Sequence, residues 1–495
     1  MKTIEVRNPA TGLKVGEVRP AAPKDLETAE TKARLAQQDW AKQPLAQRAA
    51  ILRRFHDLTV ERSDRILDVI QSESGKARRD ALVEIITVAG TTRYYLSHGR
   101  EHLSGRLRQP AVPAITDAQV VYKPHGLVGL ISPWNYPFLL SIGDAIPALL
   151  AGNAVIVKPS ELTPLSADLA QQLLREAGLN EDLLTILHGG GDVGAQLIRH
   201  VDYIGFTGGT ETGRKVAVAA AEQLIPFSLE LGGKNPMIVL EGAPLDQAVN
   251  GLVVGAFANS GQTCIGIERV YVQDSIFKFF ADRLAEQASA MKLGWSTGWD
   301  FDMGSLISER HADKVSGHVE EARKAGAKIL SGGRRRSDLG PAFVEPTVLT
   351  DVPDSVSVFR QETFGPVVAL YPVRNAEEAV RLANDSEFGL NASLWSADAA
   401  KSERIAQRLE TGSVAINSTL LIYNSFDVPM GGVKHSGIGR RHGEQGILRY
   451  TQAQSIVSSV PTGGGYDALL THVNRSSRVD LILKALRFWR RLPWV

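Results

Sequence analysis

Residues 127–158 read LVGLISPWNYPFLLSIGDAIPALLAGNAVIVK and decide the fold class of this chain. Two short apolar runs, at 127–132 and 154–158, flank a longer apolar stretch that contains Asp144, Pro147 and Asn153. These three residues argue against a membrane span, although the stretch 138–157 has the roughly 20 residues that a span needs. We therefore expect a buried helix from Phe138 and then a buried strand.

The same alternation continues along the chain. Short β-branched runs begin at residues 183, 203 and 236, and a helical stretch follows each of them. Strands that are apolar on both faces and alternate with helices indicate a parallel sheet that is covered on both sides. A second series begins near residue 269 and runs past 414, so we predict two α/β domains that join near residue 233. The apolar period predicts helices over 25–40 and 45–74, with a stop at Gly75.

The composition excludes several classes of protein. The chain has 495 residues, with 55 basic and 54 acidic side chains and a net charge of +1. This balance argues against nucleic-acid binding, which depends on a basic excess. The single cysteine excludes an intrachain disulfide and a tetrahedral thiolate site, and we expect no metal. Residues 1–10 lack the apolar core of a signal peptide, so we expect a cytoplasmic location.

Two glycine-rich turns could each hold a phosphate group. Residues 188–194, HGGGDVG, contain a GxGxxG pattern, and residues 208–215, GGTETGRK, nearly form a P-loop. A helix that begins at such a turn offers free backbone amides to an anion. The first turn lacks a clear acidic partner about 20 residues later, and Arg214 and Val216 interrupt the second. A dinucleotide therefore stays possible, whereas a nucleoside triphosphatase is disfavoured.

Three polar residues have neighbours that suit catalysis. Cys264 ends the small, polar run NSGQTC, and it is either a buried structural cysteine or a reachable thiolate nucleophile. Glu230 lies between two leucines, and it is a surface carboxylate, an ion-pair partner of Lys234, or a desolvated general base. Asn135 in PWNYP is either a turn residue or an amide donor to an oxyanion.

The order and spacing of the motifs resemble the aldehyde dehydrogenase superfamily. The motifs that carry this resemblance, over about residues 5–457, are PWNYP (133–137), KPSE (158–161), GFTGGTETG (205–213), LELGGKNP (229–236), GQTC (261–264), QETFGPV (361–367) and PMGGVKHSGIGR (429–440). The resemblance implies an α/β fold with three parts. These are a Rossmann-like cofactor domain (1–105 and 125–232), an α/β catalytic domain (233–436) and a small β oligomerisation arm (106–124 and 445–460). It also implies a homodimer or homotetramer.

The resemblance implies a mechanism and a set of site residues. Cys264 matches the nucleophile that attacks the aldehyde carbonyl. Asn135 and the Cys264 amide match the oxyanion hole, and Glu230 matches the base that activates water to release the acid from a thioester. The residues that match cofactor ligands of the family are Trp134, Lys158, Glu161, Gly208, Gly209, Glu362 and Phe364. The family binds its cofactor at the second glycine turn, so HGGGDVG is expected to be a packing turn.

The cofactor residues depart from the family pattern at one position and leave the choice of cofactor open. Many members have serine where this chain has Gly209, so one hydroxyl contact to phosphate is missing. Glu161 would repel a 2′-phosphate and can bind a free ribose hydroxyl, which favours NAD as the cofactor. Lys158 could accept a phosphate, which keeps NADP as the alternative.

The predicted substrate pocket is apolar. By analogy with the family it includes Tyr136, Leu139, Ile265, Leu420 and Phe426. This set has no arginine or lysine for a distal carboxylate, so we expect oxidation of a hydrophobic, aliphatic or aromatic aldehyde.

Two alternatives to a dehydrogenase of hydrophobic aldehydes stay open. The chain also resembles a bacterial branch often labelled succinate-semialdehyde dehydrogenase, which makes succinate semialdehyde the alternative substrate. Arg269 follows the nucleophile in that branch and is expected to be structural. A non-catalytic binding relative is a remote alternative, which the presence of Cys264 and Glu230 disfavours.

Residues 461–495 form an appendage outside the resemblance. One helical face carries apolar side chains, and basic residues lie opposite them; the apolar positions are Val479, Ile482, Leu486 and Trp489. The pattern predicts an amphipathic helix with one of three roles. It packs on its own or a partner subunit, contacts a membrane surface through residues 479–491, or covers the substrate entrance.

Overall fold

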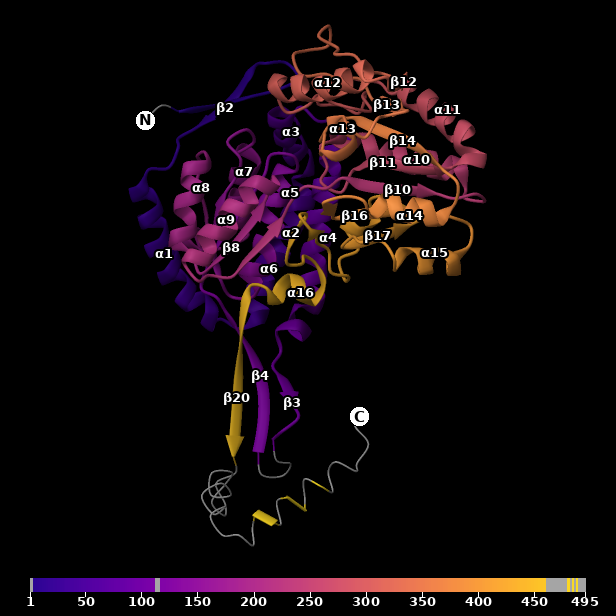
Figure 1. The fold of residues 1–495 in the computed structure, drawn as a ribbon. Helices are drawn as coiled ribbons and strands as arrows, with labels where there is room; N and C mark the ends of the chain where they lie inside the picture. Colours follow the sequence, from indigo (N-terminus) through magenta and orange to yellow (C-terminus); the bar gives the residue numbers. More distant parts are fainter. Residues whose placement is uncertain (1–2, 112–115, 460–478, 481–482, 485–486, 488–495) are drawn as a thin grey trace. The chain divides into compact units, whose positions relative to one another are not determined.

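The structure is a computed structural model that describes residues 3–111, 116–459, 479–480, 483–484 and 487 (Figure 1). The chain forms two units, one of Met1–His102 with Pro124–Tyr450 and the other of Leu103–Lys123 with the chain from Thr451 onward. Most of the tail after residue 460, including Ile482, Leu486 and Trp489 of the predicted amphipathic face, lies outside the described residues.

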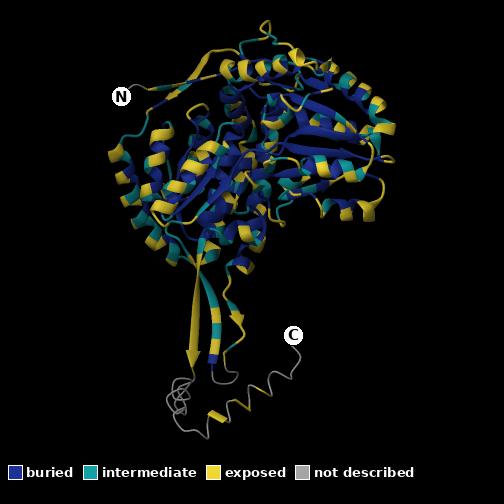
Figure 2. Ribbon diagram, in the orientation of Figure 1, coloured by how far each residue is buried: buried dark blue, intermediate teal, exposed yellow. Residues whose placement is uncertain are grey.

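The larger unit contains a six-stranded sheet built from the first series of apolar runs. Its order is β19-β9-β8-β5-β6-β7, and β5 to β9 are parallel. The strands are β5 (Leu127–Ile131), β6 (Ala154–Lys158), β7 (Leu184–Ile186), β8 (Tyr203–Thr207), β9 (Phe227–Glu230) and β19 (Gly437–Ile438). All five residues of β6 are buried, and the central strands form a continuous buried layer in Figure 2. Burial on both faces explains why these runs do not alternate apolar and polar residues.

A seven-stranded sheet follows in the same unit. Its order is β12-β13-β14-β11-β10-β16-β17, and only β12 is antiparallel to its neighbour. The strands are β10 (Asn235–Val239), β11 (Ile267–Gln273), β12 (Lys328–Ser331), β13 (Thr347–Thr350), β14 (Val367–Val373), β16 (Asn391–Trp395) and β17 (Ser413–Ile416). The chain passes from one sheet to the other between Glu230 and Asn235. The predicted α/β class with parallel sheets is thereby confirmed.

Helices accompany both sheets. Those of the N-terminal half are α1 (Pro23–Lys42), α2 (Leu45–Glu61), α3 (Ser63–Ser74), α4 (Arg78–Leu103), α5 (Pro137–Ile142), α6 (Ala145–Leu150), α7 (Leu165–Glu176), α8 (Gly191–Leu197) and α9 (Thr210–Glu222). Those that follow are α10 (Leu245–Phe257), α11 (Asp274–Ala290), α12 (Glu309–Lys324), α13 (Ser357–Arg360), α14 (Ala376–Asn384), α15 (Ala399–Ala406) and α16 (Gly443–Leu448). Two short pairings complete the unit, β1 (Ile4–Arg7) with β2 (Lys14–Val18) and β15 (Phe388–Gly389) with β18 (Val433–Lys434).

Two of the predicted helices are divided in the structure. The period over 45–74 becomes α2 and α3, because Arg62 between them leaves helical geometry at φ −104° and ψ 17°. Gly75 ends α3 at φ 70°, in the left-handed region that glycine adopts without steric cost. The stretch after Phe138 becomes α5 and α6, separated by Gly143 and Asp144, rather than one helix.

Pro147, which has no N–H to donate to the carbonyl of Gly143, accounts for the break between α5 and α6. Asp144, at the break, belongs to a buried ion cluster. Its carboxylate is 2.7 Å from Arg441 Nη2 and 2.6 Å from Arg449 Nη2, and all three side chains are largely buried. Burial alone would raise the pKa of Asp144, but the two guanidinium groups outweigh burial and lower it to about 2. This buried ion cluster ties the chain around α16 to the segment between α5 and α6.

The smaller unit contains a three-stranded sheet with the order β20-β4-β3. Its strands are β3 (Arg106–Arg108), β4 (Thr116–Pro124) and β20 (Thr451–Ser459), and β3 runs antiparallel to β4. Of the predicted arm segment 445–460, the residues up to Tyr450 belong to the larger unit.

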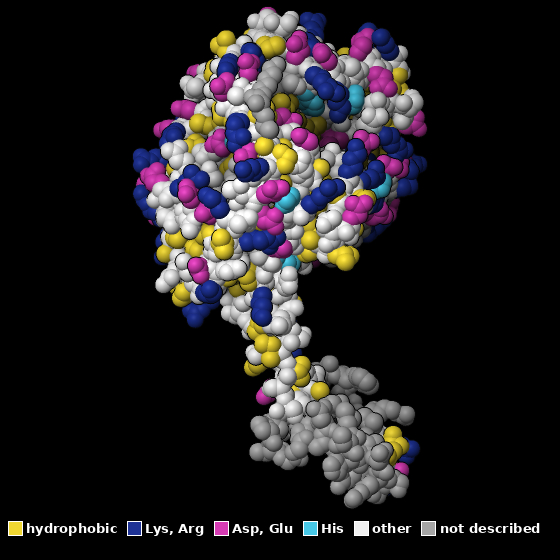
Figure 3. Space-filling view, turned by 90° about the vertical axis from the view of Figure 1, so that its left-hand side faces the viewer, with side chains coloured by type: hydrophobic (Ala, Val, Ile, Leu, Met, Phe, Trp, Pro, Cys, Tyr) yellow, Lys and Arg dark blue, Asp and Glu magenta, His cyan; other side chains and the backbone are white. Residues whose placement is uncertain are grey.

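The described surface fits the balanced composition. Basic and acidic side chains are interspersed over the described residues of the face in Figure 3. None of the described helices is both long and apolar enough to cross a bilayer.

Candidate active site

Cys264 lies where two cavities of the larger unit meet. One cavity has a volume of about 530 Å³ and is lined by Cys264 together with Tyr136, Thr263, Ile265 and Trp395, among others. The second has a volume of about 220 Å³ and is lined by Cys264 together with residues from four other sequence motifs. A thiol at this junction can face a molecule in each cavity.

A strained turn brings Cys264 to this junction. Asn259, Ser260 and Gly261 have φ values of 52°, 56° and 72°, so three successive residues adopt the left-handed conformation directly after α10. A Cβ on Gly261 would lie 2.1 Å from the carbonyl oxygen of Gly365, so only glycine fits there. Strain of this kind persists only where the surrounding structure enforces it, and it is concentrated at functional sites.

Asn135 is bonded to the same turn. Its Nδ2 donates a hydrogen bond of 2.9 Å to the carbonyl oxygen of Gln262, two residues before Cys264. The Tyr136 hydroxyl lies 2.8 Å from the Thr263 hydroxyl. A carboxamide nitrogen has two N–H groups, so the bond to Gln262 leaves one for an oxyanion. The structure therefore brings the predicted oxyanion donor and the predicted nucleophile together.

Glu230 ends β9 and lines the smaller cavity with Cys264. Its side chain is buried, and Oε1 has no hydrogen-bond partner among the described residues. Burial raises the pKa of Glu230, and the charges of Arg441 and Arg449 partly oppose this effect. The predicted alternative of an ion pair with Lys234 is wrong, because Lys234 is paired with Glu268.

The Cys264 thiol is protonated at neutral pH in this state of the molecule. Burial, and then the nearby charge of Glu230, raise the pKa of Cys264 to about 12. A base or a change in the local charge must therefore assist its attack on a carbonyl, because the thiolate is the nucleophilic form.

Most of the predicted cofactor residues line the smaller cavity. Trp134, Gly208, Gly209, Glu362 and Phe364 all line it. Gly209 precedes α9, and no side chain caps this helix. Its first backbone amides can therefore bind an anion such as a pyrophosphate.

The glycines of the motif LELGGKNP hold the Glu362 side chain in place. Glu362 Oε1 accepts a hydrogen bond of 2.8 Å from the Gly233 amide. A Cβ on Gly232 would lie 2.6 Å from Glu362 Oε2, so the glycines of LELGGKNP give this carboxylate its place. Burial and the charge of Glu268 raise the pKa of Glu362 to about 7. Phe364, at φ 56°, packs edge-on against Trp134 with ring centroids 5.4 Å apart.

Lys158 and Glu161 lie outside the lining of this cavity. Lys158 Nζ donates a 2.9 Å hydrogen bond to the carbonyl oxygen of Gly189 and lies 3.6 Å from a carboxylate oxygen of Glu161. Glu161 is half-exposed. The HGGGDVG turn is thus tied to the end of β6 through Lys158.

The larger cavity contains three of the five predicted pocket residues, Tyr136, Ile265 and Leu420. Leu139 is on α5 and faces a small enclosed space beside Asp144 instead. Phe426 packs against His442, with ring centroids 5.5 Å apart, and fills the space beside Gly90 of α4.

The sequence patterns did not indicate the part of the lining that comes from α4, α10 and β16. Asn250, Gly251 and Val254 come from α10, Val83 comes from α4, and Trp395 ends β16. The lining contains no lysine, arginine or histidine. Arg269 lies on β11, is absent from this lining and donates to the carbonyl oxygens of Lys234, Leu382 and Ala383, which is the structural role expected from the sequence.

A cluster of buried charges at the start of α4 was also missed. Lys76 and Glu84 form an ion pair of 2.7 Å with almost no exposed surface, and Asp80 is buried beside them. Burial raises the pKa of Asp80 to about 6. The available signal was Glu84 within the apolar run ALVEIITV, where a carboxylate needs a buried partner.

The comparisons with known proteins agree with this geometry. The family model described as "Aldehyde dehydrogenase family" matches residues 1–456 of the chain. A relative from Mycolicibacterium smegmatis is 46% identical over 91% of this chain and 87% of its own length, and it is named "Putative succinate-semialdehyde dehydrogenase", with NADP(+) as cofactor. A relative from Methylomonas sp, named "4,4'-diapolycopene aldehyde oxidase", is 40% identical over 91% of this chain and 85% of its own length.

A solved structure is also similar. The succinate-semialdehyde dehydrogenase from Burkholderia pseudomallei is 36% identical, with a TM-score of 0.89 over 93% of this chain and 95% of that one. The chain belongs to the aldehyde dehydrogenase family, and it is an NAD(P)-dependent oxidoreductase that acts on aldehydes.

We predict that alkylation of the unliganded chain by iodoacetamide speeds up about tenfold per pH unit between about pH 7 and 9, because only the thiolate reacts. Mass spectrometry reports Cys264 alone, since the chain has one cysteine. Glu230→Gln should accelerate labelling at a given pH, because the charge of Glu230 raises the pKa of the thiol. A rate that levels off below about pH 8 would show a thiolate already present at neutrality.

Proposed function

We propose that this chain oxidises its aldehyde at Cys264, with Asn135 and Glu230 as the other catalytic residues. The observation that carries this proposal is the position of Cys264, shared by two cavities, with Glu230 in the lining of one and Asn135 bonded to the turn before it. A substrate in the larger cavity and a cofactor in the smaller one would meet at the thiol.

Each of the three residues has a chemical task in this proposal. The Cys264 sulfur forms a bond to the aldehyde carbon, and the oxygen that becomes negative accepts hydrogen bonds from the Asn135 amide and the Cys264 backbone amide. A bound nicotinamide cofactor would supply the hydride acceptor for the oxidation. Glu230 takes a proton from the water that releases the acid from sulfur. Burial raises the pKa of the Glu230 carboxyl, which makes it a stronger base for this step.

Cys264→Ala should abolish oxidation and leave cofactor binding intact, because the thiol is the covalent centre and not a cofactor ligand. Glu230→Gln should give one turnover of reduced cofactor, seen as a burst of absorbance at 340 nm, and then stall. Removal of the Glu230 charge lowers the pKa of the Cys264 thiol and so permits acylation, whereas hydrolysis loses its base. Turnover of the Cys264→Ala variant above about 1% of wild type would contradict the assignment of Cys264 as the nucleophile. A glutamine variant without a burst would mean that Glu230 also activates the thiol.

The cofactor is proposed to lie across the N-terminus of α9, with its adenosine ribose at Lys158 and Glu161. The uncapped amides of α9 and the glycines at 208 and 209 suit a pyrophosphate. The sequence favours NAD because of Glu161, whereas the relative from Mycolicibacterium is named for NADP(+). The proximity of Lys158 to Glu161 supports either choice, since the lysine can bind a 2′-phosphate and the carboxylate a ribose hydroxyl.

Opposite changes in cofactor preference are expected at these two residues. Glu161→Gln should raise the ratio of kcat/KM for NADP to that for NAD by about tenfold, and Lys158→Met should lower it. Tenfold corresponds to about 1.4 kcal/mol. Two unit charges about 4 Å apart at an effective dielectric near 20 interact with roughly 4 kcal/mol. The expected change is the fraction of this repulsion that remains after screening by solvent and salt. An unchanged ratio in both variants would show that the ribose lies elsewhere.

Two substrates are candidates, and a specific observation favours each. The names of the relatives favour succinate semialdehyde, which is the alternative of the sequence-based prediction, more directly than they favour a hydrophobic aldehyde. The cavity of this chain favours an uncharged aldehyde, since its lining has no cationic side chain and includes Ile265, Trp395 and Leu420. A distal carboxylate in this cavity would depend on neutral donors such as Asn250 and Ser418.

A matched pair of substrates separates these candidates. We predict that kcat/KM for the methyl ester of succinate semialdehyde exceeds that for the free acid by about tenfold, because a carboxylate without a cation costs desolvation free energy. Along the series from propanal to octanal, kcat/KM should rise up to about fourfold per methylene, from about 0.8 kcal/mol of burial each. A free acid that outperforms both its ester and octanal would assign the enzyme to succinate semialdehyde.

The assembly and the location of the chain stay predictions. We propose that the sheet of β3, β4 and β20 mediates a homodimer or homotetramer, which the exposed side chains along β20 support. The cytoplasmic location, and a peripheral membrane contact through residues 479–491, rest on the sequence alone.

A further inference from the structure

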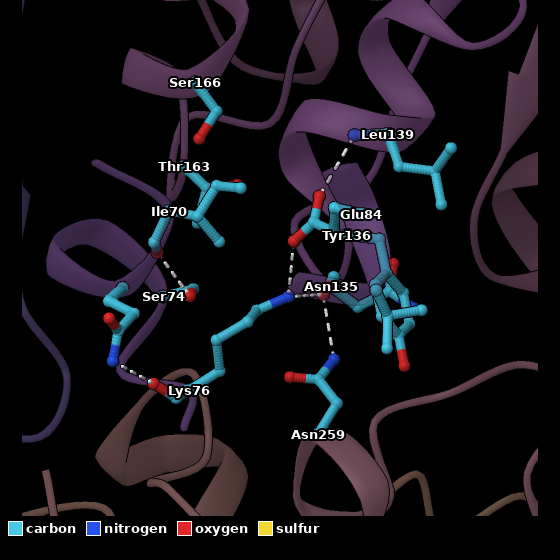
Figure 4. Close-up of polar contacts among 12 residues, drawn as sticks. Ile70, Ser74, Lys76, Glu84, Asn135, Tyr136, Leu139, Thr163, Ser166 and Asn259 are labelled. Carbon is cyan, nitrogen blue, oxygen red and sulfur yellow. Dashed lines mark hydrogen bonds and ion pairs between the residues drawn. The ribbon is translucent and has the colours of Figure 1, made fainter. Parts of the chain in front are cut away.

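We propose that Lys76 and Glu84 are positioning residues for the oxyanion donor, and that this buried ion pair sets the direction of the Asn135 side-chain amide. The inference rests on the proposed function, since it concerns the step in which Asn135 stabilises the oxyanion. Figure 4 shows the Lys76 side chain reaching both Glu84 and the backbone of Asn135. Neither residue lines either cavity, so both act through Asn135 rather than on the substrate.

All the surroundings of the Lys76 ammonium group suit a positive charge. Nζ donates hydrogen bonds of 2.7 Å to Glu84 Oε1 and 2.7 Å to the carbonyl oxygen of Asn135. It also lies 4.4 Å from the centroid of the Tyr136 ring. The lysine side chain is only 1% exposed. A buried ammonium with an anion, a carbonyl and an aromatic face as neighbours is held in one geometry.

The Asn135 carbonyl is held from two sides. Besides Lys76, Asn259 donates a hydrogen bond of 2.8 Å from Nδ2 to the same oxygen. Both lone pairs of this oxygen are therefore used. These bonds fix the peptide plane that follows Asn135. With the bond from Asn135 Nδ2 to Gln262, they leave the side-chain amide little freedom to turn.

Glu84 holds the other end of the same segment. Its Oε2 accepts a hydrogen bond of 3.0 Å from the backbone amide of Leu139, in the first turn of α5. Lys76 and Glu84 thus bind the chain on both sides of Tyr136. The pair connects the start of α4 to the whole segment 135–139, which carries the predicted oxyanion donor.

Arg48 is another buried charge of the described chain, and its hydrogen bonds go to other segments. Its guanidinium donates to the carbonyl oxygens of Leu150 and Gln43. Arg48 therefore stabilises the packing of α2 without touching Asn135. It provides a matched control for a role of Lys76 in stability alone.

The test is a double-mutant cycle between Lys76→Met and Asn135→Ala in the full chain, measured as the single-turnover rate of cofactor reduction. We expect Lys76→Met to lower this rate by about tenfold to a hundredfold, which is less than the 10²–10³-fold cost of losing an oxyanion donor. The KM for the aldehyde should change less than threefold. The double variant should be no slower than Asn135→Ala, because a residue that acts through Asn135 has no effect once the amide is gone.

Controls separate positioning from stability. Lys76→Met combined with Glu84→Gln removes both charges, so this variant folds without an unpaired buried ion. It should keep the slow single-turnover rate. Arg48→Met should lower the melting temperature and leave the rate unchanged.

The outcomes of this experiment are distinct. The positioning role would be overturned if the rate losses of Lys76→Met and Asn135→Ala multiplied in the double variant. It would also be overturned if Lys76→Met, alone and combined with Glu84→Gln, kept the wild-type rate. A wild-type chain without aldehyde oxidation would instead overturn the proposed function.

Discussion

The left-handed turn of Asn259, Ser260 and Gly261 is the constraint on which the rest of the site depends. Positive φ values at Asn259 and Ser260 are costly, and the turn persists because its neighbours enforce it. Gly261 packs against the carbonyl of Gly365, which leaves no room for a Cβ. Asn259 binds the carbonyl of Asn135. The turn therefore connects Cys264 to the loop of Glu362 on one side and to the loop of Asn135 on the other.

Buried ion pairs stabilise the loops that this turn connects. Lys76 with Glu84 supports the segment of Asn135, and Lys234 pairs with Glu268. Glu268 in turn accepts hydrogen bonds from the amides of Thr363 and Phe364. A buried ion pair adds little net stability over apolar packing, but removing one partner is costly. Such pairs are well suited to fix the geometry of a loop.

The same low-dielectric surroundings set the chemistry of the site. Burial raises the pKa of Cys264 to about 12 and that of Glu362 to about 7, and it raises the pKa of Glu230 as well. A buried carboxyl such as Glu230, with its raised pKa, is a stronger base than a solvated one. The larger cavity shares this apolar character, since its lining includes Ile265, Trp395 and Leu420 and has no lysine, arginine or histidine.

The sequence by itself determined the fold class, the family and the enzyme class. Buried parallel strands are apolar on both faces, so each strand can be recognised from its own residues. The motifs around Asn135, Glu230 and Cys264 follow one another in the order of the aldehyde dehydrogenase family, which identifies the family and its enzyme class. The buried ion cluster of Asp144 was not predictable, because its arginine partners, Arg441 and Arg449, lie about 300 residues away. A local period carries no information on such a contact.

Only the tertiary structure decided which side chains line the cavities and which charges support them. Leu139 and Phe426 are apolar and lie in the expected segments, yet both point away from the larger cavity, whereas Val254 and Trp395 line it from distant elements. Glu84 stood out in its apolar run, but its partner Lys76, from the loop between α3 and α4, and their contact with the carbonyl of Asn135 became visible only in the tertiary structure. The reason is physical: a motif fixes the type of a residue and its local backbone, but burial and partners arise from contacts between segments that are far apart in the chain.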